Sequence, residues 1–345
     1  MKLNAACRGD PDHRRVVAAC LVKGAYVLQR DKGKNRLGEQ TLAPPWWESF
    51  GFQLFDTLKD CIIVKSTFGA IFKFKFPPPS SNGVDQDQLP PTYAVAFRGT
   101  MTTPQTICKD WRLDLKLIFE GIEGRSRVQC AIKAIESTVG IAQAAATIWV
   151  AGHSLGSTVG QLAGRKIFKA NPKARINYYL FNPPFPSLFF TYLAFVRINS
   201  EVKYVLSFVR NCIIDLIDRL QNDDCQREEL DKSFAELSQW VPNLFLNLSD
   251  PICVGYAGYF NQRKKMGRRA WLRKIKQRAA RISSQALLKR AMRFKNCKAE
   301  HLLPSAHVTV AKGSSGEFRQ AHKLQEWWQP NIEYQCERHV FNEMI

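Results

Sequence analysis

The chain has 345 residues, of which 45% are apolar and 23% charged, proportions that are ordinary for a globular protein. They argue against wholesale disorder, a collagen-like repeat and a protein with many membrane spans, and the longest apolar run, Leu188 to Val196, is too short to cross a bilayer. The formal charge of +20 is uneven, because Arg263 to Lys298 holds 15 Lys or Arg and no acid. The remaining residues are nearly neutral, with 35 basic and 30 acidic side chains.

The ten cysteines show no CxxC spacing and no Cys/His cluster, so no zinc or other metal site is expected. The closest cysteines in sequence, such as Cys7 and Cys20, are 13 residues apart. We therefore expect reduced thiols in a cytoplasmic protein. The first 15 residues reach charged side chains before an apolar segment builds up, so neither a secretory signal nor a transit peptide is expected.

The first part of the chain predicts helices. Apolar residues recur at helical spacing over residues 12–30, with Asp12 as the expected cap. A second helix is expected from Pro45 to Leu58. Residues 1–58 are therefore predicted to form a helical N-terminal extension.

Strands dominate the next part of the chain and then alternate with helices. Two β-rich runs, Cys61 to Lys65 and Ala70 to Phe76, predict a hairpin, and the proline-rich stretch Pro77 to Pro91 predicts a loop. The alternating strands and helices are expected at Tyr93 to Phe97, Arg125 to Ala144, Thr147 to Ala151, after Ser154, Asn177 to Phe181, Leu244 to Leu248 and Val308 to Ala311. This alternation predicts an α/β fold with a mostly parallel central sheet flanked by helices. Since no linker divides the chain, residues 1–345 are expected to form a single domain.

The most informative segment is Gly152-His-Ser-Leu-Gly156, which lies between a short apolar run and a helix-compatible run. A serine on a sharp turn between a strand and a helix forms a nucleophile elbow, and its flanking glycines leave out Cβ atoms that would collide there. The helix that follows directs free N–H groups toward developing negative charge. We therefore predict that Ser154 is a catalytic nucleophile, the alternative being an ordinary glycine turn.

A nucleophilic serine needs a base, which in such a fold follows the serine and the acid along the chain. His322 comes after the last expected strand and a glycine-serine loop, directly before an expected helix from Lys323 to Trp328, where the base belongs. His307 begins an expected strand, His339 lies in a polar tail, and His301 is the main alternative. The non-catalytic explanation for His322 is a surface residue at a helix start.

Asp250 is the candidate acid. It follows the apolar strand Leu244 to Leu248 and precedes a proline, so it lies at the carboxyl end of a strand, between the serine and the histidine in chain order. The other aspartates between them, from Asp215 to Asp231, lie in helical or polar stretches. Its expected role is to hold the tautomer of His322 and to stabilise the imidazolium. The alternative is a capping aspartate in a turn.

Two further motifs complete a set that resembles a known family. Phe97-Arg-Gly-Thr100 and Asp110-Trp111-x-x-Asp114 precede the elbow, and in this order the set is similar to the class 3, or fungal-type, lipases of the α/β-hydrolase superfamily. The resemblance is strongest to a plant branch whose members often carry the name GDSL esterase/lipase, although this chain contains no Gly-Asp-Ser-Leu. It covers roughly residues 10 to 330.

The resemblance implies the remaining site residues. By the family pattern, Thr100 supplies one backbone N–H of the oxyanion hole, helped by its hydroxyl, and Leu155 supplies the other. Asp110, Trp111 and Asp114 are then expected to brace the loop that holds Thr100. The resemblance implies carboxylic esters as substrates and requires no metal and no organic cofactor.

Two features depart from the family pattern. The strand after the elbow helix continues as Phe181-Asn-Pro-Pro-Phe185, where fungal members usually have Gly-x-Pro-Arg. The chain also carries insertions, namely the apolar stretches Ser187 to Val196 and Val202 to Leu220 and the basic segment of residues 263–298. The apolar stretches are expected either to form walls of an acyl-chain pocket over the site or to complete the core.

The basic segment of residues 263–298 is compatible with an amphipathic helix. Its apolar face consists of Trp271, Leu272, Ile275, Ala279 and Ile282. Such a helix suits anionic lipid headgroups, which would make the protein peripheral on membranes, and a solvated insertion is the alternative. Nucleic acid is not an expected partner, because no RRM, KH or zinc-knuckle pattern accompanies the charge.

The sequence thus predicts an α/β-hydrolase with helical insertions that cleaves an acyl ester or lipid by Ser-His-Asp catalysis. An acyltransferase that uses the same triad is one alternative. The other is a non-catalytic protein that keeps the fold and binds an anionic membrane or a partner through the basic segment, because a fold alone does not guarantee activity.

Overall fold

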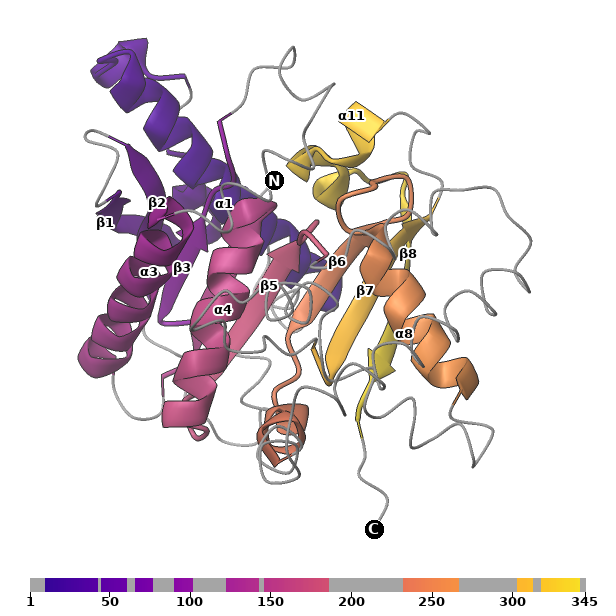
Figure 1. Ribbon diagram of the computed structural model, residues 1–345. Coiled ribbons are helices and arrows are strands. Elements are labelled where there is room, and N and C mark those ends of the chain that lie inside the picture. The colour runs from indigo at the N-terminus through magenta and orange to yellow at the C-terminus, as the bar shows by residue number, and fades with distance from the viewer. Residues whose placement is uncertain are drawn as a thin grey trace. The chain divides into compact units, whose positions relative to one another are not determined.

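A computed structural model describes nine stretches of the chain, which are coloured in Figure 1. These are residues 10–42, 45–60, 66–76, 90–101, 122–142, 146–185, 232–266, 303–312 and 318–341. Several sequence predictions lie outside the described residues, namely Cys61 to Lys65, most of Pro77 to Pro91, Asp110, Trp111, Asp114, Ser187 to Val196, Val202 to Leu220, residues 267–298 and His301.

The chain divides into two compact units. The first comprises Met1–Pro184, Pro242–Phe245 and His322–Ile332, and the second comprises Phe185–Val241, Leu246–Ala321 and Glu333–Ile345. The single domain expected over residues 1–345 stays a prediction. The elements of the first unit are α1 (Pro11–Gly33), η2 (Gly38–Gln40), η3 (Trp46–Phe50), β1 (Phe52–Lys59), β2 (Thr67–Phe74), β3 (Tyr93–Phe97), α3 (Ile122–Ile141), β4 (Ile148–His153), α4 (Leu155–Ala170), β5 (Ile176–Phe181), the first part of β6 (Asn243–Asn247) and η6 (Leu324–Trp328).

The strands of the first unit form a mixed sheet in the order β1-β2-β3-β4-β5-β6. The two pairs from β1 to β3 are antiparallel, and the three pairs from β3 to β6 are parallel. Parallel neighbours need crossover connections, and α4 leads from β4 to β5. The register pairs Phe97 with Gly152 and His153 with Phe181, so the carboxyl ends of β3, β4 and β5 lie together. The predicted α/β class with a parallel core is confirmed.

Helices cover both faces of this sheet (Figure 1). A Cβ atom added to Gly160 of α4 would touch Leu180 and Val150 at 3.4 and 3.5 Å, whereas one added to Gly24 of α1 would meet Phe72 at 3.1 Å. The helix α3 packs beside α4. Every residue of β3 and β4 is buried, as expected for strands that are covered on both sides.

The N-terminal region differs from its prediction in two places. The cap of α1 is Asp10 and not Asp12, because Asp10 accepts a hydrogen bond from the Asp12 N–H at 3.0 Å. The helix expected from Pro45 to Leu58 is wrong after Phe50, since Gly51, at φ 83°, ends η3 and the chain continues as β1. The first strand of the expected hairpin, Cys61 to Lys65, lies outside the described residues. Its second strand, Ala70 to Phe76, overlaps β2, which pairs antiparallel with β1.

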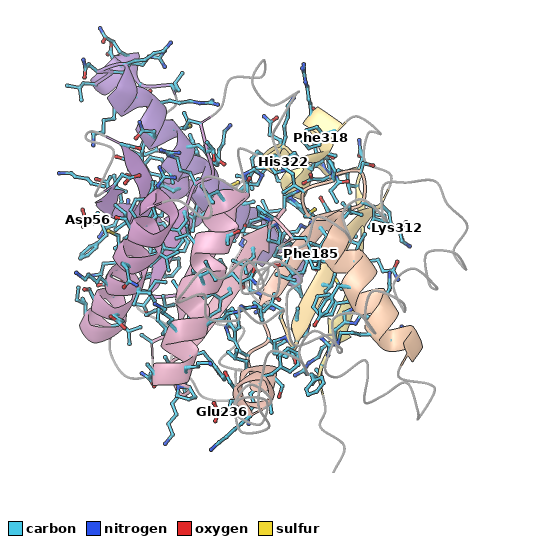
Figure 2. All side chains as sticks on the ribbon, viewed as in Figure 1. Asp56, Phe185, Glu236, Lys312, Phe318 and His322 are labelled. Carbon is cyan, nitrogen blue, oxygen red and sulfur yellow. The ribbon has the colours of Figure 1, made fainter. Side chains whose placement is uncertain are left out.

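The second unit contains the remainder of β6 together with η5 (Leu237–Gln239), α8 (Val254–Met266), β7 (Ala306–Lys312), α11 (Phe318–Ala321) and β8 (Glu333–His339). The strands β7 and β8 form an antiparallel pair, the β7–β8 pair, from Ala306 opposite His339 to Lys312 opposite Glu333; Figure 2 labels Lys312. The sequence predicts β7 but indicates only a polar tail where β8 lies.

The expectation of reduced thiols is wrong at one position. Cys130 of α3 is disulfide-bonded, whereas Cys20, Cys253 and Cys336 are thiols. Spacing along the sequence shows only which cysteines are near in the chain, and it says nothing about cysteines that the fold brings together.

Candidate active site

Ser154 stands on the turn between β4 and α4. Its backbone has φ 53° and ψ −125°, a left-handed φ that costs strain for a residue with a side chain. The Ser154 N–H donates to the Phe181 carbonyl at 2.9 Å, and the Ser157 hydroxyl oxygen lies 2.7 Å from the carbonyl oxygens of Gly152 and Phe181. A buried serine held this way between a strand and a helix has the geometry of a nucleophile elbow.

The glycines around the turn are required by close backbone packing. A Cβ atom on Gly152 would lie 2.5 Å from the carbonyl oxygen of Gly156, and one on Gly156 would lie 2.4 Å from the carbonyl oxygen of Phe97. Both distances are far shorter than a carbon–oxygen contact allows. The sequence prediction that these glycines remove colliding Cβ atoms is therefore confirmed.

The loop after β3 lies against the elbow. A Cβ atom on Gly99 would be 3.0 Å from the Ser154 Cβ, so Thr100 directly follows a residue that packs against the serine. The Thr100 hydroxyl oxygen is buried and has no hydrogen-bond partner within the described part of the chain. Leu155 opens α4 and is buried. An unsatisfied buried hydroxyl at this place suits a site that a bound group completes.

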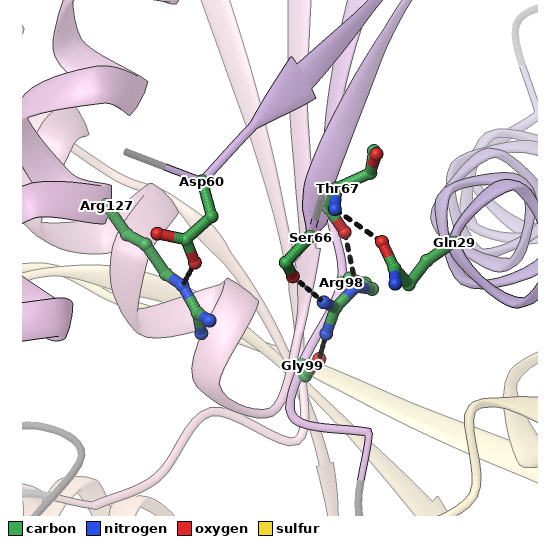
Figure 3. Close-up of polar contacts among 7 residues, drawn as sticks. All are labelled: Gln29, Asp60, Ser66, Thr67, Arg98, Gly99 and Arg127. Carbon is green, nitrogen blue, oxygen red and sulfur yellow. Dashed lines mark hydrogen bonds and ion pairs between the residues drawn. The ribbon is translucent and has the colours of Figure 1, made fainter. Parts of the chain in front are cut away.

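Arg98 fixes the loop that carries Gly99 and Thr100 (Figure 3). Its guanidinium donates to the carbonyl oxygens of Thr67 and Gly99, both at 2.6 Å, and to the Ser66 hydroxyl at 3.0 Å. Burial lowers the pKa of Arg98 to about 10, so the side chain remains protonated at neutral pH and keeps these donors. The sequence motif identified this stretch but not the role of its arginine.

Tyr26 of α1 contributes to the site, which the sequence did not predict. Its hydroxyl accepts a hydrogen bond from the Gly99 N–H at 2.7 Å and lies 2.9 Å from Nδ1 of His153. Burial raises the pKa of Tyr26 to about 12. Tyr26 lies among buried alanines and valines of α1, and the helical pattern alone gave it no role beyond the core.

His322 lies beside the elbow within the first unit. Its carbonyl oxygen is 2.9 Å from Nε2 of His153, the residue before Ser154, and the two imidazole rings are 5.0 Å apart. Figure 2 labels His322, which precedes the turn into η6. His307 and His339 lie on β7 and β8 of the second unit. The assignment of His322 as the base stays a prediction.

Asp250 belongs to the second unit, where it is fully buried just after β6. Its Oδ1 accepts a hydrogen bond from the Ile252 N–H at 2.9 Å, and its carbonyl accepts from the Val254 N–H at 3.0 Å where α8 begins. The negative charge of Asp250 and burial together raise the pKa of the Cys253 thiol well above its usual value, with burial the larger cause. The residue thus makes the capping contact of its non-catalytic alternative, and its role as the catalytic acid stays a prediction.

A cavity of about 280 Å³ lies at the opposite ends of the same strands. Its apolar wall includes Phe52, Phe74, Phe76, Pro91 and Trp149. None of its lining residues belongs to the elbow or to the loop after β3. It is therefore separate from the candidate active site.

In the described ranges, no helix is both long and apolar enough to cross a membrane. Within the same residues, no group of three or more His, Cys, Asp or Glu side chains is arranged to hold a metal ion.

A strained serine between a parallel strand and a helix, with a glycine loop from the neighbouring strand against it, defines the α/β-hydrolase class. No family model matches the chain. It is 32% identical over 331 residues to the protein "GDSL esterase/lipase At4g10955" of Arabidopsis thaliana, a match that covers 94% of this chain and 91% of that protein. The chain therefore belongs to this esterase/lipase family, and the resemblance predicted from its motifs is confirmed.

Among solved structures, the chain is similar to the crystal structure of a lipase from Rhizopus microsporus var. chinensis. The match has 16% sequence identity and a TM-score of 0.29, and it covers 53% of this chain and 60% of the lipase chain.

Proposed function

We propose that this protein hydrolyses carboxylic esters, with Ser154 as the nucleophile. The observation that carries the proposal is the backbone of Ser154, at φ 53° and ψ −125° on the turn from β4 into α4. Folding tolerates such strain where a function requires it. The family relative, which carries the name esterase/lipase, supports the same chemistry.

In the proposed first step, the Ser154 hydroxyl attacks the ester carbonyl while His322 accepts its proton. Asp250 orients the imidazole and stabilises the imidazolium without taking the proton. The backbone N–H groups of Thr100 and Leu155 donate to the oxyanion, and the Thr100 hydroxyl, buried and unpaired among the described residues, provides a third donor. The alcohol then leaves with the proton from His322.

In the second step, water attacks the acyl-enzyme with His322 as base, and the carboxylic acid leaves as Ser154 recovers its proton. We propose acyl lipids as the substrate class and a cytoplasmic protein that docks peripherally on membranes. The support for docking is the charge of residues 263–298, which carry 15 basic residues and no acid.

Labelling with a fluorophosphonate tests the nucleophile, because this probe forms a covalent bond with an activated serine. We expect stoichiometric labelling of the parent and none of Ser154→Ala. Ser49→Ala, an exposed serine of η3, is the matched control and should label like the parent. Far-UV circular dichroism of each variant shows that the fold persists. A well-folded parent that does not label would support the non-catalytic alternative.

Product analysis separates the hydrolase from the acyltransferase. An acyl ester is incubated with the parent in the presence of a competing alcohol. We expect the free acid as the main product, formed in proportion to substrate consumed. Predominant transfer to the added alcohol would show that the site uses the same acyl-enzyme for transfer.

Vesicle binding tests the proposed docking. Electrostatic attraction to anionic vesicles should weaken with salt, because the Debye length contracts from about 10 Å at 0.1 M to about 3 Å at 1 M. Reversal of four charges, Arg268, Arg269, Arg273 and Lys274 to Glu, should abolish binding while leaving hydrolysis of a short soluble ester nearly unchanged. If the reversed protein binds as well as the parent, the docking role is wrong.

A further inference from the structure

We infer that Tyr26 and His153 are positioning residues that join the oxyanion loop to the segment of the catalytic histidine. The inference rests on the proposed function and adds two residues to its site. Neither side chain belongs to the triad or supplies an oxyanion donor.

The directions of the hydrogen bonds form one continuous chain. The His322 carbonyl oxygen is only an acceptor, so Nε2 of His153 donates to it across 2.9 Å. In neutral His153 the other nitrogen, Nδ1, is then an acceptor, and the Tyr26 hydroxyl donates to it across 2.9 Å. The Tyr26 oxygen in turn accepts from the Gly99 N–H at 2.7 Å. Three hydrogen bonds thus connect the Gly99 N–H to the His322 carbonyl through the two side chains.

The Tyr26 phenol stays protonated over the working pH range, which keeps these linked hydrogen bonds intact. Burial raises its pKa to about 12, so the phenol remains a donor from acidic to moderately alkaline solution. The hydroxyl also fits its place by shape, because a Cβ atom on Gly99 would lie 2.6 Å from it. Only glycine lets the phenol approach the loop this closely.

Gly99 is held from its other side as well. Arg98 donates to the Gly99 carbonyl at 2.6 Å while Tyr26 accepts from the Gly99 N–H at 2.7 Å. Both backbone polar groups of Gly99 are thus held, and its carbonyl belongs to the same peptide unit as the Thr100 N–H. The chain of contacts therefore sets the oxyanion donor of Thr100 relative to the backbone of His322, through a residue that directly precedes Ser154.

Such positioning affects the chemical step more than substrate binding. The proposed reaction needs the oxyanion donor and the base in register with one serine, and small displacements of reacting groups reduce rates steeply. Loss of these linked hydrogen bonds should therefore lower kcat and leave KM nearly unchanged. If the residues merely stabilised the fold, their replacement would lower the temperature of unfolding without lowering kcat selectively over KM.

The test compares Tyr26→Phe, His153→Phe and the double variant, with p-nitrophenyl butyrate as substrate. We expect each single variant to lose about 10- to 100-fold in kcat, with KM within about twofold of the parent. The kcat of the double variant should be no lower than that of the poorer single variant, because either change breaks the same series of hydrogen bonds. Tyr93→Phe, a buried tyrosine at the opposite end of β3, is the matched control and should keep parental kinetics.

A conservative change and a spectroscopic signal separate positioning from stability. His153→Gln keeps a side-chain N–H for the His322 carbonyl and should recover part of the kcat lost in His153→Phe. Nitrogen-15 NMR of the imidazole should show His153 as the neutral Nε2–H tautomer, with an Nδ1 signal that shifts in Tyr26→Phe. Losses in the double variant that multiply would overturn the inference.

The two proposals fail in different ways. If the folded parent is not labelled by a fluorophosphonate, the proposed function is wrong and the positioning role falls with it. If the parent is labelled but Tyr26→Phe reacts and turns over like Tyr93→Phe, only the positioning role is wrong.

Discussion

The elbow of the first unit and the β7–β8 pair of the second hold their polar groups in opposite ways. At the elbow, backbone meets backbone closely enough that Cβ atoms on Gly152 and Gly156 would lie 2.5 and 2.4 Å from carbonyl oxygens. At the β7–β8 pair, ion pairs bridge exposed side chains, such as Lys312 and Glu333 at 3.7 Å. The first arrangement leaves no room for adjustment, whereas the second depends on charges that solvent screens. The two regions should therefore respond to different perturbations.

The largest expected effect comes from the chemistry of the elbow. Ser154→Ala or His322→Ala should each lower kcat on a short ester by several powers of ten, because each removes a group on which the acyl transfer depends. The double variant should be scarcely worse than either single variant, since members of a triad act as a unit. Steady-state kinetics of the three proteins measure this, and losses that multiply would argue against a shared triad.

A smaller but still large effect is expected on stability at the same turn. Gly156→Ala places a methyl group 2.4 Å from the Phe97 carbonyl oxygen and should cost about 3 kcal/mol in the free energy of unfolding, or prevent folding. Gly160→Ala, one turn later in α4, meets only side chains at 3.4 Å or more. It should leave stability unchanged or raise it by up to about 1 kcal/mol through helix propensity.

Denaturant unfolding of both alanine variants decides the point. Equal stabilities would show that the backbone at the elbow yields, and the contrast between rigid elbow and adaptable surroundings would be lost.

The elements that sequence predicted well are those with one dominant signal. The sequence predicted β3 residue for residue at Tyr93–Phe97, because five consecutive apolar residues follow a proline-rich stretch there. β8 was missed because its residues are mostly exposed and polar, so no apolar alternation marked it as a strand. β1 was predicted as helix, since a short run of mixed residues fits either period and only pairing with β2 settles it.

The candidate site divides in the same way. Ser154 was identifiable because its flanking glycines are fixed by local geometry. Tyr26 was not identifiable, since its contacts with Gly99 and His153 join residues 73 and 127 positions away. The sequence pattern of a helix reports which face is apolar, and it carries no information about a distant partner of a single hydroxyl.

Thr100→Val should separate activity from stability at the edge of the elbow. The change removes a hydroxyl that is buried and unpaired among the described residues, so the unfolding temperature should stay equal or rise. If the hydroxyl helps to bind the oxyanion, kcat should fall about 10- to 100-fold. Thr100→Ser, which keeps the hydroxyl, is the control. Parental kcat in Thr100→Val would remove the hydroxyl from the mechanism.

The smallest expected effect is a pH dependence confined to the β7–β8 pair. Burial lowers the pKa of His307 below its usual 6.5, and the charge of Arg338 lowers it further. Burial also lowers the pKa of His339, with Glu337 opposing the shift and Arg263 and Lys264 adding to it.

The direction of this pH dependence follows from proton binding. Near pH 6 the unfolded chain binds more protons at these histidines than the folded chain does, so acidification favours unfolding. The stability that the neutral forms of His307 and His339 contribute is fully present above about pH 6.5, and it is lost as the pH falls below that value. His307→Gln removes one of the two groups, whereas His13→Gln, in α1 of the first unit, is the control. We expect the fall in unfolding temperature between pH 7.5 and 5.5 to be smaller in His307→Gln than in His13→Gln by about 1–2 °C, because half-buried groups are strongly screened. Equal falls in the two variants would mean that protonation of His307 does not affect stability in this range.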